Sequence, residues 1–182
     1  MKTEARVHLL EREEVTPEIG AVYDALLAAR GVVPNMFKVL AHSPAIAPAV
    51  AGFLKPLLAD GALQGSYKEL VAVRISQCSA CEYAIRAHSI SARQKGASEE
   101  QISGVSSFAT GPYSAKEKLG FRLAQKLHDG GHAVDDAFFS ELQANFSEAE
   151  LVELFLVAAA FEMFPRFIDG LRIPATPPPA AK

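Results

Sequence analysis

The chain has little of several features that mark specialised classes of protein. Its 182 residues include no tryptophan and only two cysteines, and the net charge is −3 with no cluster of lysine and arginine. A basic patch is the electrostatic footprint of a nucleic-acid-binding protein, so we expect no nucleic-acid partner. The longest apolar run, residues 154–161, is far shorter than the roughly 18 residues of a membrane-spanning helix. We therefore expect no membrane partner either.

The N-terminal stretch MKTEARVHLLEREE lacks the apolar core of a secretory signal peptide, so we expect a cytoplasmic protein. Thiols stay reduced in the cytoplasm, where two closely spaced cysteines are more often catalytic or metal-binding than a structural disulfide. The length and the 49% of hydrophobic residues suit one globular domain. We expect this domain to span residues 1–173, followed by a proline-rich tail, 174–182, that is extended or disordered.

The pattern of apolar residues predicts helices almost throughout, and no stretch alternates apolar and polar residues long enough to require a strand. Five helix starts are indicated by a serine with Glu or Gln three residues later, the pattern of a capping box. The five pairs are Ser66/Glu69, Ser79/Glu82, Ser98/Gln101, Ser114/Glu117 and Ser147/Glu150. The predicted fold class is all-α. The sequence Glu-Leu-Val followed by an apolar stretch occurs at 69–71 and again at 150–152, which leaves both a degenerate internal duplication and chance open.

Both cysteines lie in one segment, SQCSACEYAIRAH, residues 76–88. If Ser79 caps a helix, Cys81 lies in its first turn, where free amides and the helix dipole favour a thiolate. Cys78 then lies just outside the helix and can close a disulfide with Cys81. His88 falls on the same face as Cys81 but seven residues on, about 10 Å along the axis, so another group must bridge them. Ala84 occupies the position between.

Other interpretations of these residues stay open. A cytosolic cysteine is most often a small buried hydrophobe, and Tyr83 can donate a hydrogen bond or simply pack. Glu69 either completes a capping box with Ser66 or, if the two helices pack antiparallel, lies beside His88 and orients its imidazole.

Metal ligation is poorly supported, so we expect neither a metal nor a cofactor. The cysteine segment offers at most three ligands. The other pair of histidines, His128 and His132, is separated by two glycines that break the helix between them, which predicts a solvated loop.

The spacing of four residues resembles the motif of the carboxymuconolactone decarboxylase and alkylhydroperoxidase D superfamily, in its peroxidase-related branch. Glu69, Cys81, Tyr83 and His88 fall on motif positions, and the segments RGVVPNMFKVLAHSP and GASEEQISGV are similar to its flanking segments. The resemblance covers about residues 5–173. It implies an all-helical bundle built around an antiparallel helical hairpin that carries the CxxC segment. It also implies a homo-oligomer, often a trimer or hexamer, although a dimer is possible.

The chain departs from this motif at one position. The family's second cysteine, one turn before the histidine, is Ala84 here, and the dithiol is displaced to Cys78 and Cys81. The family's peroxidase mechanism therefore cannot be transferred unchanged, because its attacking cysteine is the one that is missing.

Three functions are compatible with these residues. The leading prediction is a weak thiol peroxidase: Cys81 attacks a hydroperoxide, Cys78 resolves the sulfenic acid, and Glu69 and His88 relay protons with Tyr83 lining the site. This activity requires a separate thiol reductant. The first alternative is a cysteine-independent lyase or decarboxylase acting on a small carboxylated lactone. The second is a non-enzymatic thiol redox sensor.

Overall fold

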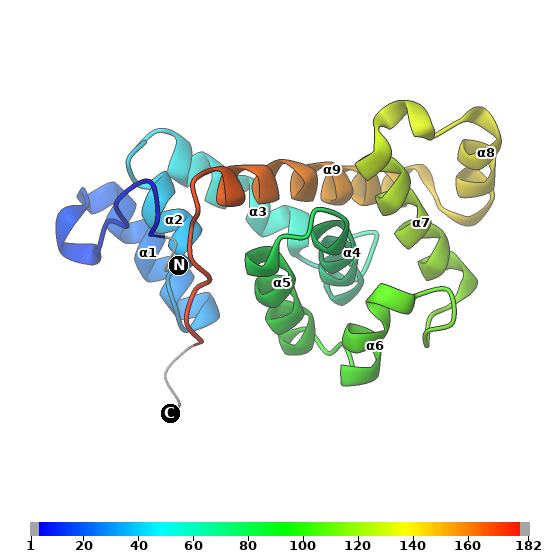
Figure 1. The fold of residues 1–182 in the computed structure, drawn as a ribbon, viewed down its shortest axis with the longest axis horizontal. Coiled ribbons are helices and arrows are strands. Elements are labelled where there is room, and N and C mark those ends of the chain that lie inside the picture. The colour runs from blue at the N-terminus through cyan, green and yellow to red at the C-terminus, as the bar shows by residue number, and fades with distance from the viewer. Residues whose placement is uncertain (1–3, 179–182) are drawn as a thin grey trace. The chain divides into compact units, whose positions relative to one another are not determined.

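The computed structural model describes residues 4–178, and this part of the chain is helical without any strand (Figure 1). The predicted all-α fold class is confirmed. The α-helices are α1 (Pro17–Arg30), α2 (Asn35–Leu40), α3 (Ile46–Leu58), α4 (Gly65–Cys78), α5 (Glu82–Gln94), α6 (Glu99–Gly104), α7 (Ala115–Asp129), α8 (Asp136–Asn145) and α9 (Glu148–Gly170). Three short 3₁₀ turns, η1 (Arg12–Glu14), η2 (Val105–Ser107) and η3 (Gly131–Ala133), complete the order. Within residues 4–178, no helix is long and apolar enough to cross a membrane.

The contacts divide the chain into two compact units. One takes in the chain up to Pro56 together with the stretch from Phe167 onward, and the other is Leu57–Arg166. The second unit holds the cysteine segment. The expectation of one domain over residues 1–173 stays a prediction.

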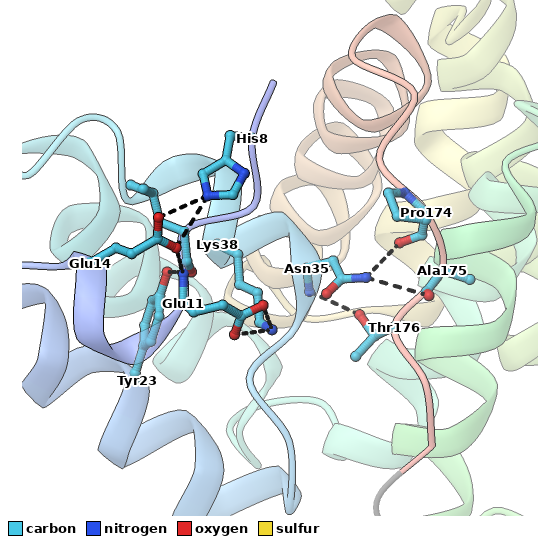
Figure 2. A network of polar contacts seen from close by, with 10 residues as sticks. His8, Glu11, Glu14, Tyr23, Asn35, Lys38, Pro174, Ala175 and Thr176 are labelled. Carbon is cyan, nitrogen blue, oxygen red and sulfur yellow. Dashed lines mark hydrogen bonds and ion pairs between the residues drawn. The ribbon is translucent and has the colours of Figure 1, made fainter. Parts of the chain in front are cut away.

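In the first unit, polar contacts of Asn35 hold the segment that follows α9 against the start of α2 (Figure 2). The backbone N–H of Asn35 donates to Thr176 Oγ1 at 3.0 Å, and its side-chain amide donates to the carbonyl of Pro174 at 3.1 Å. Residues 173–178 are not helical, and the expectation of an extended or disordered tail stays a prediction. The remainder of the predicted tail lies outside the described residues.

The core of the second unit is the hairpin of α4 and α5. Its two helices are joined by only three residues and contact each other more extensively than any other pair of elements (Figure 1). Glu69 near the start of α4 meets Lys95 just after the end of α5, so the helices run antiparallel. The helix α4 is buried on nearly all sides, from Tyr67 to Ser76. The hairpin expected from the resemblance is therefore present.

The break between the two helices is a left-handed turn at Ala80, whose φ is 52°. The backbone N–H of Cys81 donates to the carbonyl of Ser76 at 3.0 Å, and that of Ala80 donates to Gln77 at 3.1 Å. These two bonds satisfy carbonyls at the end of α4, in the manner of a Schellman motif. Cys78 therefore lies outside the helix that follows the turn, as expected.

Two of the five predicted helix starts were wrong. Ser79 is the C-cap of α4, and its hydroxyl donates back to the carbonyl of Ile75 at 3.1 Å. Ser66 lies inside α4, which begins at Gly65 because the carboxylate of Asp60 accepts the Gly65 N–H at 2.7 Å. The carboxylate of Glu69 is thus free of any capping role. Reciprocal capping bonds confirm the other three starts, at Ser98, Ser114 and Ser147.

Candidate functional site

The centre of the site is a buried carboxylate–imidazole pair. Glu69, in the first half of α4, has no exposed surface, and His88 on α5 is 7% exposed. The Nδ1 atom of His88 lies 2.6 Å from Glu69 Oε2. The predicted approach of these two side chains across the hairpin is confirmed.

A third member of the site, Lys95, was not foreseen from the sequence. Its ammonium donates to Glu69 Oε1 at 2.6 Å and to the carbonyl of Leu58 at 2.6 Å. Both oxygens of the buried carboxylate are therefore engaged. The signal available in the sequence is spacing: Lys95 follows His88 by seven residues, two helical turns, and so shares its face. Because the Lys95 side chain is 32% exposed, it connects the buried carboxylate with the solvent.

The charges around Glu69 keep its carboxylate ionised. Burial alone would raise the pKa of Glu69, but the hydrogen bond and charge of His88, together with Lys95, outweigh burial and hold the pKa below its ordinary value. Glu69 is then ionised at neutral pH and can only accept, so His88 Nδ1 carries a hydrogen and donates it. The other ring nitrogen, Nε2, is left as the atom that can take or give a proton during a reaction. The Phe161 ring meets the imidazole edge-on at 4.2 Å between centroids and restrains its orientation.

The two cysteines lie at the turn of the hairpin in different environments, and neither forms a disulfide. Cys81 is the N-cap residue of α5 and is completely buried. The prediction that it lies within the first turn was wrong, because α5 begins at Glu82, two residues later than a cap at Ser79 would require. Cys81 thus lies directly before the first turn of α5, and its side chain makes no capping hydrogen bond there.

Cys78 is the last residue of α4 and is only partly buried. Burial raises the pKa of its thiol, and the nearby charge of Arg74 opposes that increase only in part. The two sulfurs therefore differ: that of Cys81 is buried at the start of α5, whereas that of Cys78 is more accessible and has a raised thiol pKa.

Two further buried residues lie on α5, the helix that carries His88. Ala84 is 2% exposed and lies one turn before His88, and Tyr83 is 8% exposed. The hairpin thus carries all five predicted site residues on α4, α5 and the turn between them, with Glu69 and His88 in direct contact.

His128 and His132 are placed differently from each other. The expectation of a solvated loop was wrong for His128, which lies in the last turn of α7 with its Nδ1 atom 2.7 Å from Glu162 Oε1 on α9. His132 lies in η3 and is exposed. Over residues 4–178, no group of three or more His, Cys, Asp or Glu side chains is arranged to hold a metal ion.

Comparison with known proteins agrees with this geometry. Residues 44–126, which include α4 and α5, match the model of the Carboxymuconolactone decarboxylase family. The uncharacterized protein YnjA of Escherichia coli (strain K12) is 28% identical over 109 residues, and the match covers 59% of this chain. The chain spans only about 60% of the length of that curated relative.

Two solved structures share the fold over nearly their whole length. One is the alkylhydroperoxidase AhpD core of an uncharacterized peroxidase-related protein from Ralstonia eutropha JMP134, with a TM-score of 0.86, 21% identity, and coverage of 94% of this chain and 92% of that one. The other is the debrominase Bmp8, solved as an alanine-for-cysteine variant in complex with 2,3,4-tribromopyrrole, with a TM-score of 0.86, 20% identity, and coverage of 97% and 95%.

The chain is therefore similar to the Carboxymuconolactone decarboxylase family over residues 44–126, and it shares its fold with the alkylhydroperoxidase AhpD core. The resemblance predicted from the spacing of Glu69, Cys81, Tyr83 and His88 is confirmed.

Proposed function

We propose that the chain is a peroxidase-related oxidoreductase that reduces hydroperoxides with its cysteine pair. The observation that carries this proposal is the buried Glu69–His88 pair, 2.6 Å across, on the same hairpin as two free thiols. A buried imidazole oriented by a carboxylate serves as a proton relay, and a cysteine at a helix N-terminus serves as a nucleophile.

The reaction runs in two steps. The Cys81 thiolate attacks the terminal oxygen of the hydroperoxide, the O–O bond breaks, and the alcohol or water leaves with a proton delivered from His88 through bridging water. The Cys78 thiolate then attacks the sulfur of the Cys81 sulfenic acid, the S–O bond breaks, and water leaves as the disulfide forms. Two equivalents of an external thiol return the two electrons.

The same geometry supports only a slow reaction. Cys81 precedes His88 by two turns, about 10 Å along the helix, and the intervening Ala84 contributes a methyl group where the resemblance implies a thiol. Because Cys81 has no exposed surface, we expect small hydroperoxides such as hydrogen peroxide to react faster than bulky ones.

A second candidate function is favoured by Lys95. Glu69, His88 and Lys95 form a complete acid–base group without either cysteine. Such a group suits a lyase or decarboxylase acting on a small carboxylated lactone. The similar debrominase suggests a halogenated aromatic compound as a further substrate to include in a screen. A thiol redox sensor would use the cysteines without turnover.

One comparison separates these functions. The wild type and the variants Cys81→Ser and Cys78→Ser are assayed with hydrogen peroxide, a small lactone acid and 2,3,4-tribromopyrrole, in the presence of dithiothreitol. We expect turnover of peroxide that is lost in Cys81→Ser. Turnover of the lactone that survives in both the Cys81→Ser and the Cys78→Ser variants would overturn the peroxidase proposal in favour of the lyase. Stoichiometric thiol oxidation without turnover would favour the sensor.

We also propose that the protein is a homo-oligomer, as the superfamily resemblance implies. Light scattering on the purified full chain is expected to give the mass of a trimer or hexamer, and a monomeric mass would contradict this proposal.

A further inference from the structure

The protein contains a second histidine–carboxylate pair that the proposed function does not use. His128 on α7 and Glu162 on α9 repeat the geometry of the first pair, with Nδ1 of the imidazole 2.7 Å from a carboxylate oxygen. Arg166 forms an additional ion pair with Glu162 and helps to fix the carboxylate. The Glu162 side chain is 13% exposed and that of His128 is 31% exposed. The second pair therefore lies at the boundary between core and solvent, unlike the first.

The packing of α4 against α7 places His128 at the same height along the helix axes as Cys78. The hydroxyl of Tyr67 donates to the carbonyl of Glu117 at 2.9 Å, 50 residues apart, and Arg74 donates to the Gln125 side chain at 3.0 Å, 51 residues apart. The constant offset shows that the two helices run in the same direction.

Cys78 lies one turn beyond Arg74, so the same offset places it beside residues 128 and 129, one turn beyond Gln125. The charges acting on the Cys78 thiol agree with this register, because they come from Arg74, Glu162 and Asp129.

Accessibility separates the roles of the two sulfurs. Cys81 is completely buried, whereas Cys78 is only partly buried. In a disulfide between them, an external thiol can reach Cys78 far more easily than Cys81. Reduction of the disulfide would then begin on the side of α4 that faces His128.

We propose that the oxidised protein is re-reduced from the Cys78 side and that His128, oriented by Glu162, delivers the proton to the departing Cys78 sulfur. This inference rests on the dithiol chemistry of the proposed function. It assigns one histidine–carboxylate pair to each half of the cycle: Glu69–His88 to oxidation by the hydroperoxide and Glu162–His128 to reduction by an external thiol.

The reduction balances as follows. The thiolate of a first external thiol attacks Cys78 Sγ, the Cys78–Cys81 bond breaks, and its electron pair leaves with Cys81. A second external thiol attacks the external sulfur of the mixed disulfide. The bond between the external sulfur and Cys78 Sγ breaks, and its electron pair stays on Cys78 Sγ. This sulfur takes a proton from Nε2 of His128, and the imidazole regains a proton from the solvent. The Cys81 thiolate takes a proton from the solvent, which received one from each external thiol as that thiol ionised. Two external thiols thus become one disulfide, and both cysteines return to thiols.

The departing Cys78 needs this proton more than an ordinary thiol does. A sulfur leaves more slowly as a thiolate when its thiol pKa is higher, and burial raises the pKa of Cys78. Protonation by His128, which lies beside Cys78 in the register of α4 and α7, would allow Cys78 to leave as a thiol.

The test isolates the reductive half of the cycle. The Cys78–Cys81 disulfide is formed with diamide and verified by mass spectrometry, so no hydroperoxide is needed. Its reduction by excess 2-mercaptoethanol is followed by alkylation of the released thiols. We expect His128→Gln and Glu162→Gln to slow this reduction by about ten-fold or more, and His132→Gln, which changes an exposed histidine of η3, to leave it unchanged.

The oxidative half provides the contrast. Oxidation of the reduced protein by hydrogen peroxide is expected to be unaffected by His128→Gln but slowed by His88→Gln, and circular dichroism verifies that each variant is folded. A purely structural role for His128 would slow both halves or neither. Unchanged reduction in His128→Gln, equal slowing in His132→Gln, or failure of diamide to link Cys78 with Cys81 would each overturn the inference. Failure of hydrogen peroxide to oxidise the protein would contradict the proposed function alone.

Discussion

At the scale of single residues, the site depends on how one buried carboxylate is compensated. Glu69 has no exposed surface, and an unpaired charge in such a place costs several kcal/mol. His88 and Lys95 each engage one of its oxygens, so the charge is retained and the imidazole is held in one tautomer. The same arrangement leaves Ala84, one turn before His88, as the nearest position on α5 where a thiol could meet the relay.

We predict that Ala84→Cys raises the rate of peroxide reduction by about ten-fold or more, because it places a thiol one turn from an imidazole that is already oriented. The matched control is Ala87→Cys on the same helix, which adds a thiol that does not share the face of His88. Initial rates with hydrogen peroxide and dithiothreitol check the prediction. Equal rates in the two folded variants would argue against a working relay.

At the scale of elements, the hairpin of α4 and α5 depends on the left-handed turn at Ala80, which the sequence pattern does not predict. The serines at 98, 114 and 147 cap helices as predicted, each through reciprocal bonds with the residue three positions later. Ser79 carries the same pattern but lies at the end of α4, where its hydroxyl donates to the preceding turn. A capping box could not be distinguished from the C-cap of the preceding helix, because Ala80 rather than glycine adopts the left-handed conformation.

We predict that Ala80→Gly stabilises the protein by about 1 kcal/mol, since glycine adopts a positive φ without the steric cost that alanine bears there. The control is Ala159→Gly, in the middle of α9 and exposed, which should destabilise by about 1 kcal/mol. Urea unfolding followed by circular dichroism measures both. Destabilisation by Ala80→Gly would contradict the left-handed turn.

At the scale of the whole molecule, the sequence predicted the family resemblance, the hairpin and the Glu69–His88 contact. The contact could be predicted because antiparallel packing of two helices with the motif spacing brings Glu69 beside His88. Lys95 and the His128–Glu162 pair could not be predicted in the same way. Lys95 reaches Glu69 only across the hairpin, and Glu162 is 34 residues from His128 on a helix whose packing no local pattern specifies. Contacts between distant elements were thus the part that required the structure.

The stability of the molecule should fall in acid because of Glu69. Its folded-state pKa lies below the unfolded value, so its contribution is complete above about pH 4.3 and is lost as the pH falls through the lower folded value. We predict that Glu69→Gln lowers the free energy of unfolding by about 3 kcal/mol at pH 7 and that its difference from the wild type shrinks below about pH 4.

The control for this prediction is Glu150→Gln. Glu150 pairs with Lys116, whose side chain is 40% exposed, so the loss at pH 7 should be about 1 kcal/mol or less. Urea unfolding of the three proteins between pH 3 and 7 measures the differences. A Glu69→Gln difference that does not depend on pH would contradict an ionised carboxylate at the centre of the site.

The most direct test of the central claim is the site and rate of the first oxidation. The reduced protein and its Glu69→Gln variant are treated briefly with hydrogen peroxide in the presence of a sulfenic-acid trap and analysed by mass spectrometry. The account predicts trapping at Cys81, followed in the absence of the trap by a disulfide with Cys78, and a rate lower by about 100-fold in Glu69→Gln. Trapping at Cys78 with Cys81 untouched, or an equal rate in the variant, would contradict it.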